Sequence, residues 1–298
     1  MKEEINMSLI PVKFKFTTKE KIIMFIIMVL MIIGIIITWI NYIENAKIKA
    51  QYELAQKQLQ EAIIQEQEEA ERKRREKLPN LTEEGKENIK HIYSSDSKRA
   101  FLTFDDGPSS NTSQILDILK EKGIKATFFV LGSNVEKKPE IVKRMYEEGH
   151  FIANHGYSHV YANIYQSPEA VLNEYNQCNQ AVRNAIGEQE YNSHLFRFPG
   201  GLAGGKYAEI KNQANTLLLE NNIVHVDWNA LNGDSEITNP TIEYEMQKIM
   251  DTTANKQSIV ILMHDAEVKK VTVEALPSII DYLSGQGYAF KNFYEIIR

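Results

Sequence analysis

Two adjacent aspartates are the first residues in this sequence that could do chemistry. Asp105 and Asp106 directly follow the apolar segment 100–104 and precede Gly107 and Pro108. Carboxylates placed against an apolar strand cost free energy unless they are paired with a cation or bind a metal. The same residues also fit a structural Asp-Gly-Pro turn in which an aspartate caps the next helix. This segment alone leaves both interpretations open.

Two histidines lie four residues apart after a later apolar segment. His155 and His159 follow residues 151–153. This spacing can place two imidazoles on one side of a metal, and two histidines with one carboxylate are a common catalytic set for a divalent metal. Gly156 stands where zinc proteases of the H-E-x-x-H type carry their general base, so the pattern is not theirs. The pair predicts a metal site completed by an aspartate from elsewhere in the chain.

Polar residues also end three later apolar segments. They are Arg197 with the glycines 200–201, Asp227 and Trp228 with Asp234, and His264. Glycines at such a point leave backbone N–H groups open to a ligand. The carboxyl ends of parallel strands meet at one edge of a barrel, so these groups and the preceding ones predict a single site.

The elements that must position these residues alternate between short apolar strands and amphipathic helices from residue 99 onward. Predicted strands are 100–104, 126–131, 151–153, 195–198, 223–227, 258–263 and 289–290. Predicted helices are 112–121, 138–148, 168–186, 206–221, 241–254 and 272–285. This alternation implies a parallel sheet of the α/β class, and its length favours a barrel, closed or nearly so. No G-x-G-x-x-G or Walker loop follows a predicted strand, which argues against nucleotide binding.

An uncharged apolar segment of nineteen residues spans 22–40. A helix needs about 20 apolar residues to cross a bilayer, so the segment predicts a membrane anchor. A cleaved signal peptide is the alternative, but the segment is too long and no A-x-A site follows it. More lysines precede the segment than follow it within twenty residues: Lys2, Lys13, Lys15, Lys19 and Lys21 against Lys47, Lys49 and Lys57. This bias predicts that residues 1–21 are cytoplasmic and that the remainder lies outside the cell.

Residues 41–98 are predicted to form a helical stalk followed by a linker. Gln, Glu, Lys and Ala dominate up to Pro79, where the helix should end, and a polar linker should run to about Lys98. Apolar residues spaced 4, 3, 4 and 3 apart form a short coiled-coil seam: Ile48, Tyr52, Ala55, Leu59 and Ala62. The seam would support at most a weak dimer, and a stalk is the preferred interpretation.

Charge and cysteine content argue against a nucleic-acid-binding protein and against a protein held together by disulfides or a four-thiolate zinc site. The 298 residues include 40 acidic and 34 basic side chains, a formal charge of −6. Nucleic-acid binding needs a concentrated basic surface, so no nucleic-acid partner is expected. Cys178 is the only cysteine, which excludes an internal disulfide and a four-thiolate zinc site.

The motifs occur in a characteristic order. They are TFDDG (103–107), H-x-x-x-H (155–159), R-x-P-G-G (197–201), D-W with a later Asp (227–234) and L-M-H (262–264). In this order they resemble the NodB-homology polysaccharide deacetylases, carbohydrate esterase family 4. The resemblance covers residues 99–298 and implies a distorted (β/α)7-type barrel that hydrolyses N-acetyl groups with a metal.

The resemblance implies a role for each matching residue. Asp106, His155 and His159 would bind one divalent cation, most simply Zn²⁺, with Co²⁺, Ni²⁺ or Mn²⁺ as alternatives. Asp105 would be the general base that deprotonates the attacking water, and His264 the general acid that protonates the leaving amine. The residue types fit these roles, because an acetamide needs an activated water and its amine needs a proton from a separate acid.

The remaining matches would support this chemistry. Arg197 would keep the base ionised and oriented, and Asp234 would pair with the acid. Leu262 and Trp228 would wall the pocket for the acetyl methyl, and a backbone N–H near Gly200 would contact the oxyanion.

Two glycines depart from the family pattern. Gly156 replaces the usual Ser or Thr after the first histidine, which removes a hydroxyl that supports that ligand. Gly200 stands where many members carry Tyr, which predicts a more open cleft.

The predicted substrate follows from the predicted location. A membrane-anchored extracellular deacetylase faces the cell wall, so peptidoglycan N-acetylglucosamine is the leading candidate, and its deacetylation should lower lysozyme sensitivity. N-acetylmuramic acid, chitin-like oligomers and O-acetyl esters are the alternatives. A non-catalytic glycan-binding protein is disfavoured because every ligand, base and acid is present.

Overall fold

The computed structural model describes residues 16–298. The chain divides into two compact units, Met1–Arg72 and Lys73–Arg298. Lys2, Lys13 and Lys15, on which the predicted membrane orientation partly depends, lie outside the described residues.

The described part of the first unit is helical. Helix α1 (Thr18–Glu76) is 59 residues long and none of its residues is buried. It contains an 18-residue window with a mean hydropathy of 3.1, which is long and apolar enough to cross a membrane. A signal sequence near the N-terminus would satisfy the same criterion. Ile48, Tyr52 and Leu59 of the predicted seam are exposed in this single chain, and dimerisation stays a prediction.

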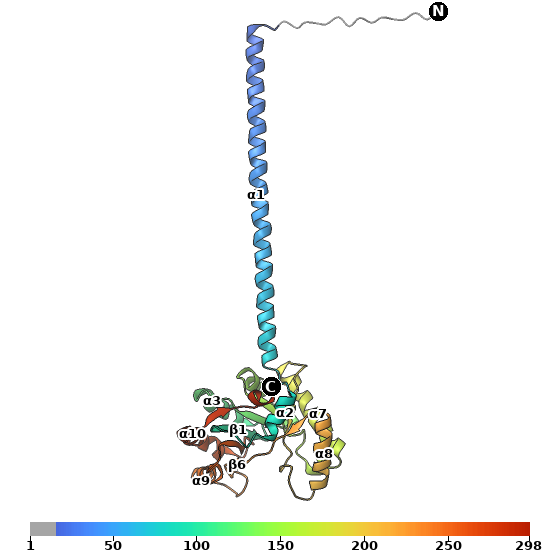
Figure 1. The fold of residues 1–298 in the computed structure, drawn as a ribbon, viewed down its shortest axis with the longest axis vertical. Helices are drawn as coiled ribbons and strands as arrows, with labels where there is room; N and C mark the ends of the chain where they lie inside the picture. The colour runs from blue at the N-terminus through green and yellow to red at the C-terminus, as the bar shows by residue number, and fades with distance from the viewer. Residues whose placement is uncertain (1–15) are drawn as a thin grey trace, which may run out of the picture. The chain divides into compact units, whose positions relative to one another are not determined.

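The second unit begins before the predicted barrel. Residues Glu83–Lys90 form helix α2 within the segment expected to be a polar linker. Leu81, Ile89 and Ile92 are buried in the core of the second unit. Gly85 allows this helix to approach the C-terminal end of the chain, because a Cβ there would lie 2.2 Å from the Ile297 carbonyl oxygen. Figure 1 shows α2 close to the C-terminus.

An eight-stranded sheet forms the centre of the unit. Its strands are β1 (Arg99–Asp105), β2 (Thr127–Val130), β3 (Phe151–Asn154), β4 (Leu195–Phe196), β5 (Val224–His225), β6 (Ala230–Leu231), β7 (Ser258–His264) and β8 (Ala289–Lys291). The order is β5-β4-β3-β2-β1-β7-β6, with β8 beside the start of β1, and every pairing is parallel.

The sheet is curled into an incomplete barrel, which confirms the predicted (β/α)7-type fold. The two ends of the strand order are β5 and β6, so hydrogen bonding does not close the barrel on that side. β6 was not predicted, because Ala230 and Leu231 stand between polar residues and belong to no longer apolar run.

Helices cover the outside of the sheet. They are α3 (Ser110–Glu121), α4 (Gly132–Lys137), α5 (Pro139–Glu147), α6 (Tyr161–Ile164), α7 (Pro168–Ile186), α8 (Ala208–Glu220), α9 (Ile242–Thr253), α10 (Lys270–Gly285) and α11 (Tyr294–Ile297). Figure 1 shows α3, α10 and α9 on one side of the sheet and α7 and α8 on the other.

Side-chain alternation along β1 decides which residues enter the barrel. Leu102 and Phe104 pack outward against the helices, whereas Phe101 belongs to the interior cluster with Phe293. Successive strand residues face opposite sides, so Asp105 shares the inward parity of Phe101. The base predicted from sequence therefore enters the interior at the carboxyl end of β1. There it is the Cα partner of His264 on β7, which brings the two strand ends together.

Candidate active site

Asp106, His155 and His159 lie together beyond the ends of β1 and β3. One potential ligand atom from each residue lies within 4.8 Å of the others. Asp106 Oδ1 lies 3.7 Å from His155 Nε2 and 3.5 Å from His159 Nε2. This oxygen is buried and has no hydrogen-bond partner among residues 16–298. An unpartnered carboxylate oxygen facing two imidazoles fits a divalent cation, because this donor set is common in zinc sites.

Left-handed backbone turns two of these side chains into the site. φ is 75° at Asp106 and 56° at His159, values that residues other than glycine rarely adopt. Such conformations concentrate at functional sites, where the surrounding structure holds them. Asp106 lies just beyond the end of β1, and the adjacent carboxylates face different partners: Asp105 faces Arg197 and Asp106 faces the two histidines.

The hydrogen bonding of His155 leaves its Nε2 lone pair free to bind a metal ion. Its Nδ1 lies 2.7 Å from the backbone carbonyl oxygen of Arg197. A carbonyl only accepts, so Nδ1 carries the hydrogen and Nε2 faces the Asp106 carboxylate unprotonated. Burial lowers the pKa of His155 to about 3, which keeps the ring neutral.

Glu174 of helix α7 fixes the loop between the two histidines. Its Oε2 accepts hydrogen bonds from the N–H groups of Tyr157 at 2.6 Å and Ser158 at 2.7 Å. Its Oε1 accepts the Ser158 hydroxyl at 2.6 Å. A buried carboxylate thus orders the backbone that spaces His155 from His159.

Asp105 is paired with a fully buried arginine. Arg197 Nη1 donates to Asp105 Oδ1 and to Thr103 Oγ1, both at 2.8 Å. Its Nε donates to the Val226 carbonyl at 3.0 Å, and its Cζ lies 3.9 Å from the Phe129 ring centroid. Burial raises the pKa of Asp105 above its ordinary value, and the guanidinium opposes that rise. The carboxylate is thereby held in one orientation and has an increased affinity for a proton.

His264 and Asp234 form a second charged pair. His264 Nδ1 lies 2.8 Å from Asp234 Oδ1, and the His264 backbone N–H donates to Asp234 Oδ2 at 2.8 Å. Thr272 also donates to Oδ2 at 3.1 Å. Burial would lower the pKa of His264, but the hydrogen bond and charge of Asp234 outweigh burial and raise it to about 9. The imidazole is therefore protonated at neutral pH.

Three side chains fix the Pro-Gly-Gly turn, residues 199–202. The Tyr165 hydroxyl donates to the proline carbonyl at 2.7 Å, and the buried Lys211 ammonium donates to the carbonyl of the second glycine at 2.6 Å. Asp227 Oδ2 accepts the leucine N–H at 3.1 Å. The Gly200 N–H has no acceptor within residues 16–298 and stays available to a ligand.

Trp228 and Leu262 border the same region. A Cβ at Gly201 would lie 3.2 Å from Trp228 Cη2, and the Arg197 Cζ lies 5.7 Å from the Trp228 ring centroid. Leu262 is the Cα partner of Thr103, which contacts the arginine. Both side chains are half-buried.

The metal set opens into a cleft of about 310 Å³. Its lining includes Asp106, His159, Asn134, Lys138 and Glu267. The cleft gives an extended polar ligand access to the metal set.

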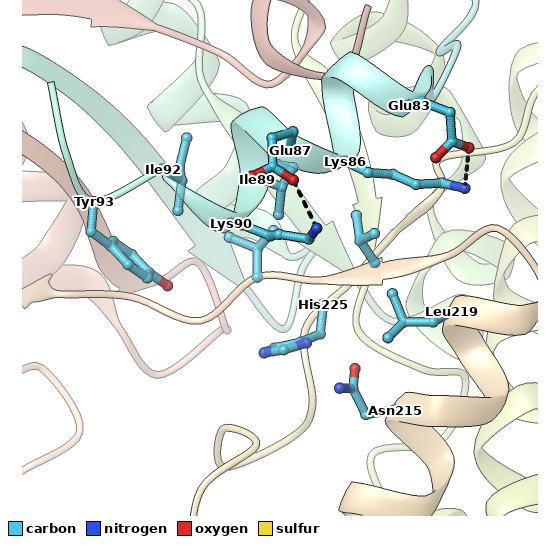
Figure 2. Close-up of a pocket in the computed structure, with 12 residues that line it drawn as sticks. Glu83, Lys86, Glu87, Ile89, Lys90, Ile92, Tyr93, Asn215, Leu219 and His225 are labelled. Atoms are coloured by element: carbon cyan, nitrogen blue, oxygen red, sulfur yellow. Dashed lines mark hydrogen bonds and ion pairs between the residues drawn. The ribbon is translucent and has the colours of Figure 1, made fainter.

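A second hollow, of about 530 Å³, lies between α2, α8 and β5 (Figure 2). Its two lysines are paired with glutamates on the same helix, Lys86 with Glu83 at 2.8 Å and Lys90 with Glu87 at 2.7 Å. This hollow contains none of the residues of the metal set.

The two departures from the family pattern have distinct local environments. At Gly156 φ is 90°, and an added Cβ would lie 3.0 Å from Ile164 Cδ1. The backbone there is held by a 2.9 Å hydrogen bond from the Gly156 N–H to Asn154 Oδ1. Beside Gly200 the Tyr161 hydroxyl occupies part of the space that was predicted to be open.

The sequence motifs did not include two residues on the surrounding helices whose side chains hold the site in place. Glu174 lies on the apolar face of α7, between Val171 and Cys178, and Lys211 lies on the apolar face of α8 with Leu218. A charged residue at a core position of an amphipathic helix needs a buried partner. That signal was available in both helices.

The chain is similar in sequence and fold to known proteins. The sequence profile of the polysaccharide deacetylase family matches residues 93–218. A peptidoglycan-N-acetylglucosamine deacetylase of Bacillus cereus is 34% identical over 201 residues, 66% of this chain and 70% of that protein. A bifunctional xylanase/deacetylase of Pseudobutyrivibrio xylanivorans is 32% identical over 66% of this chain and 30% of that protein. The structure of a Streptococcus mutans CE4 esterase aligns with a TM-score of 0.63 and 29% identity, covering 71% of this chain and 92% of that one.

The chain belongs to the polysaccharide deacetylase family, carbohydrate esterase family 4. The family is one of hydrolases that remove acetyl groups from polysaccharides. The fold and family predicted from the motifs are confirmed, and of the predicted enzyme the polysaccharide deacetylase class is confirmed, whereas metal dependence and the peptidoglycan substrate stay predictions.

Proposed function

We propose that this protein is a metal-dependent N-deacetylase of cell-wall glycan that acts on the N-acetylglucosamine of peptidoglycan. The observation that carries the proposal is the placement of two charged pairs around one metal set. Asp105 with Arg197 and His264 with Asp234 meet at neighbouring strand ends, beside the unpartnered Asp106 oxygen.

Asp106, His155 and His159 hold the cation, most simply Zn²⁺. When bound, the ion lowers the pKa of water and polarises the acetyl carbonyl. The remaining chemistry is done by side chains of this chain.

Asp105 accepts the proton of the attacking water. Its carboxylate is buried and has an elevated pKa, which suits a base, and Arg197 keeps it in one orientation. The water oxygen bonds to the acetyl carbon, and the Gly200 N–H donates to the oxygen that becomes negatively charged.

His264 donates a proton to the departing nitrogen. Its protonated state at neutral pH follows from Asp234 at 2.8 Å. The C–N bond breaks, acetate leaves and the sugar retains an amine. Trp228 and Leu262 border the acetyl methyl and limit the size of the acyl group.

The substrate assignment is supported by the relatives and by helix α1. A Bacillus cereus relative is a peptidoglycan-N-acetylglucosamine deacetylase, and α1 contains a segment long enough to span a bilayer. We propose that residues 22–40 anchor the chain, with residues 1–21 in the cytoplasm, a helical stalk that begins at residue 41, and the catalytic unit, which the structure extends back to Lys73, facing the cell wall.

The test is acetate release from purified peptidoglycan by the full-length chain in detergent, before and after chelation and Zn²⁺ addition. Muramidase fragments analysed by mass should lose about 42 Da per modified sugar, the mass of an acetyl group replaced by hydrogen. Fragmentation should place the loss on N-acetylglucosamine. The Asp105→Asn variant should release no acetate.

Other outcomes would change the assignment. Release only from O-acetylated xylan would make the protein an O-acetyl esterase, and release only from chitin oligomers would replace the substrate. No release from any of these glycans by the zinc-loaded protein would refute the enzymatic proposal. If peptidoglycan is the substrate in cells, deletion should increase lysozyme sensitivity, and unchanged sensitivity would argue against that role.

A further inference from the structure

Tyr161 lies beside the candidate metal ligand His159, and its ring is held by contacts with other aromatic side chains. It begins helix α6, two residues after His159. Its ring centroid lies 5.6 Å from that of His159, 5.5 Å from that of Tyr165 and 6.3 Å from that of Tyr207. The side chain is 39% exposed. These edge contacts restrict the ring while part of it faces solvent.

The Tyr161 hydroxyl lies next to Gly200. A Cβ at Gly200 would stand 2.7 Å from this oxygen. Within residues 16–298 the hydroxyl makes no hydrogen bond, whereas the neighbouring Tyr165 hydroxyl donates to Pro199 at 2.7 Å. The Gly200 N–H also lacks a protein acceptor in this part of the chain. Two unused donors therefore lie together beside the metal set.

Hydrolysis of an acetamide converts a neutral carbonyl oxygen into an anionic one. Donors that are fixed before the reaction stabilise that charge without reorganising. We propose that the Tyr161 hydroxyl donates a hydrogen bond to this oxygen as its charge develops, beside the Gly200 N–H. This inference rests on the deacetylase function proposed above, and it makes Tyr161 a catalytic residue.

The experiment compares Tyr161→Phe with the unmodified full-length protein on a soluble N-acetylglucosamine oligomer. Phenylalanine retains the ring contacts and removes only the donor. Removing one oxyanion donor typically costs about 100-fold or more in kcat, so a fall of about 100-fold is expected. KM should stay within about twofold, because the donor acts mainly in the transition state.

Tyr157→Phe is the matched control. Its hydroxyl comes from the same loop but donates to the exposed Glu136 at 2.8 Å. This variant should retain the kcat of the unmodified protein. Affinity for a methylphosphonamidate analogue of the tetrahedral intermediate, measured by calorimetry, should fall in Tyr161→Phe by about the same factor as kcat.

The outcomes separate this inference from the proposed function. If the unmodified protein releases no acetate, the proposed function fails first. If it is active and Tyr161→Phe keeps its kcat, or changes only KM, the oxyanion role is refuted. Equal melting temperatures for the two tyrosine variants would exclude misfolding as the cause of a lower kcat.

A double-mutant cycle tests the placement of the hydroxyl. Gly200→Ala should lower kcat in the unmodified background, because its Cβ would displace the Tyr161 oxygen. In the Tyr161→Phe background the nearest ring atom would be 3.5 Å from that Cβ, an ordinary contact. The glycine substitution should therefore cost less in kcat there, and equal costs in both backgrounds would contradict the proposed geometry.

Discussion

Replacing Asp234 with asparagine removes the negative charge that faces His264. The carboxylate oxygen lies 2.8 Å from His264 Nδ1, and a second oxygen accepts the His264 backbone N–H. Asparagine has nearly the same shape but retains only one acceptor, so the substitution removes the charge and one of the two hydrogen bonds that Asp234 accepts from His264. None of the proposed metal ligands contacts Asp234 through a hydrogen bond within residues 16–298.

The size of the effect follows from the pKa of His264. With Asp234 present this pKa is about 9, and loss of the Asp234 charge leaves burial, which lowers the pKa, opposed only by the charges of Asp105 and Asp106. A full return to the ordinary value of 6.5 would be a shift of about 2.5 pKa units, or about 3 kcal/mol. At pH 7.5 that shift would lower the protonated fraction from about 97% to about 9%, so acid-dependent turnover should fall by up to about tenfold.

The Asp234→Asn substitution should also lower the stability of the fold, by an amount that depends on pH. The folded pKa of His264 lies above its ordinary value of 6.5. The charged pair therefore stabilises the fold fully below about pH 6.5, and this contribution is lost as pH rises through about 9. Asp234→Asn should lower the melting temperature more at pH 6 than at pH 9.5.

The direct assay is an NMR titration of the His264 ring in the full-length protein, together with the pH profile of acetate release. The basic limb of the kcat profile should move to lower pH by up to about 2.5 units. Asp251→Asn, a charge-neutralising change on the exposed face of α9, should leave both measurements unchanged. A His264 pKa above 8 in the Asp234→Asn variant would refute the electrostatic argument.

Four other substitutions test the remaining parts of the site. Arg197→Met should lower the free energy of unfolding by about 3–5 kcal/mol, because Asp105 is left buried without its partner. Chemical denaturation measures this loss. Adding Asp105→Asn to the same variant should recover part of it. Glu174→Gln should weaken zinc binding about 10- to 100-fold in calorimetry, since the charge that orders the histidine loop is lost; unchanged affinity would remove this residue from the site. Asp106→Ala and His159→Ala should each abolish stoichiometric zinc binding in metal analysis, and retention of one equivalent would contradict the assigned ligand set.

Local chemistry in the sequence indicated which residues cluster at the centre of this site, and the family resemblance supplied their proposed roles. Asp105 and Asp106 follow an apolar strand, and the histidine spacing adds two ligands within five residues. These motifs can be recognised in the sequence because each one is short and lies at the end of a single strand. The predicted Arg197–Asp105 and Asp234–His264 pairs are both formed in the structure.

The supporting residues depend on contacts between distant segments. Tyr161 acquires its position only when residue 200 folds against it, and no local pattern encodes that approach. Helix α2 was not predicted for a different reason. Its charged composition resembles that of a linker, and only the spacing of Ile89 and Ile92 indicates a buried face. Residue types together with the family resemblance therefore indicated the candidate reacting groups better than the elements that support them.

Because the arginine in the barrel interior needs the charge of the catalytic base as its partner, the stability of the fold depends on that base. Arg197 bonds to β1 through Asp105 and to the segment after β5 through Val226. A substitution that removes the Asp105 charge leaves a guanidinium without its counter-charge inside the barrel. Loss of this base by a single substitution thus carries a folding cost in addition to its catalytic cost. Selection for a foldable chain would therefore protect the base even during periods when the glycan substrate exerts no selection.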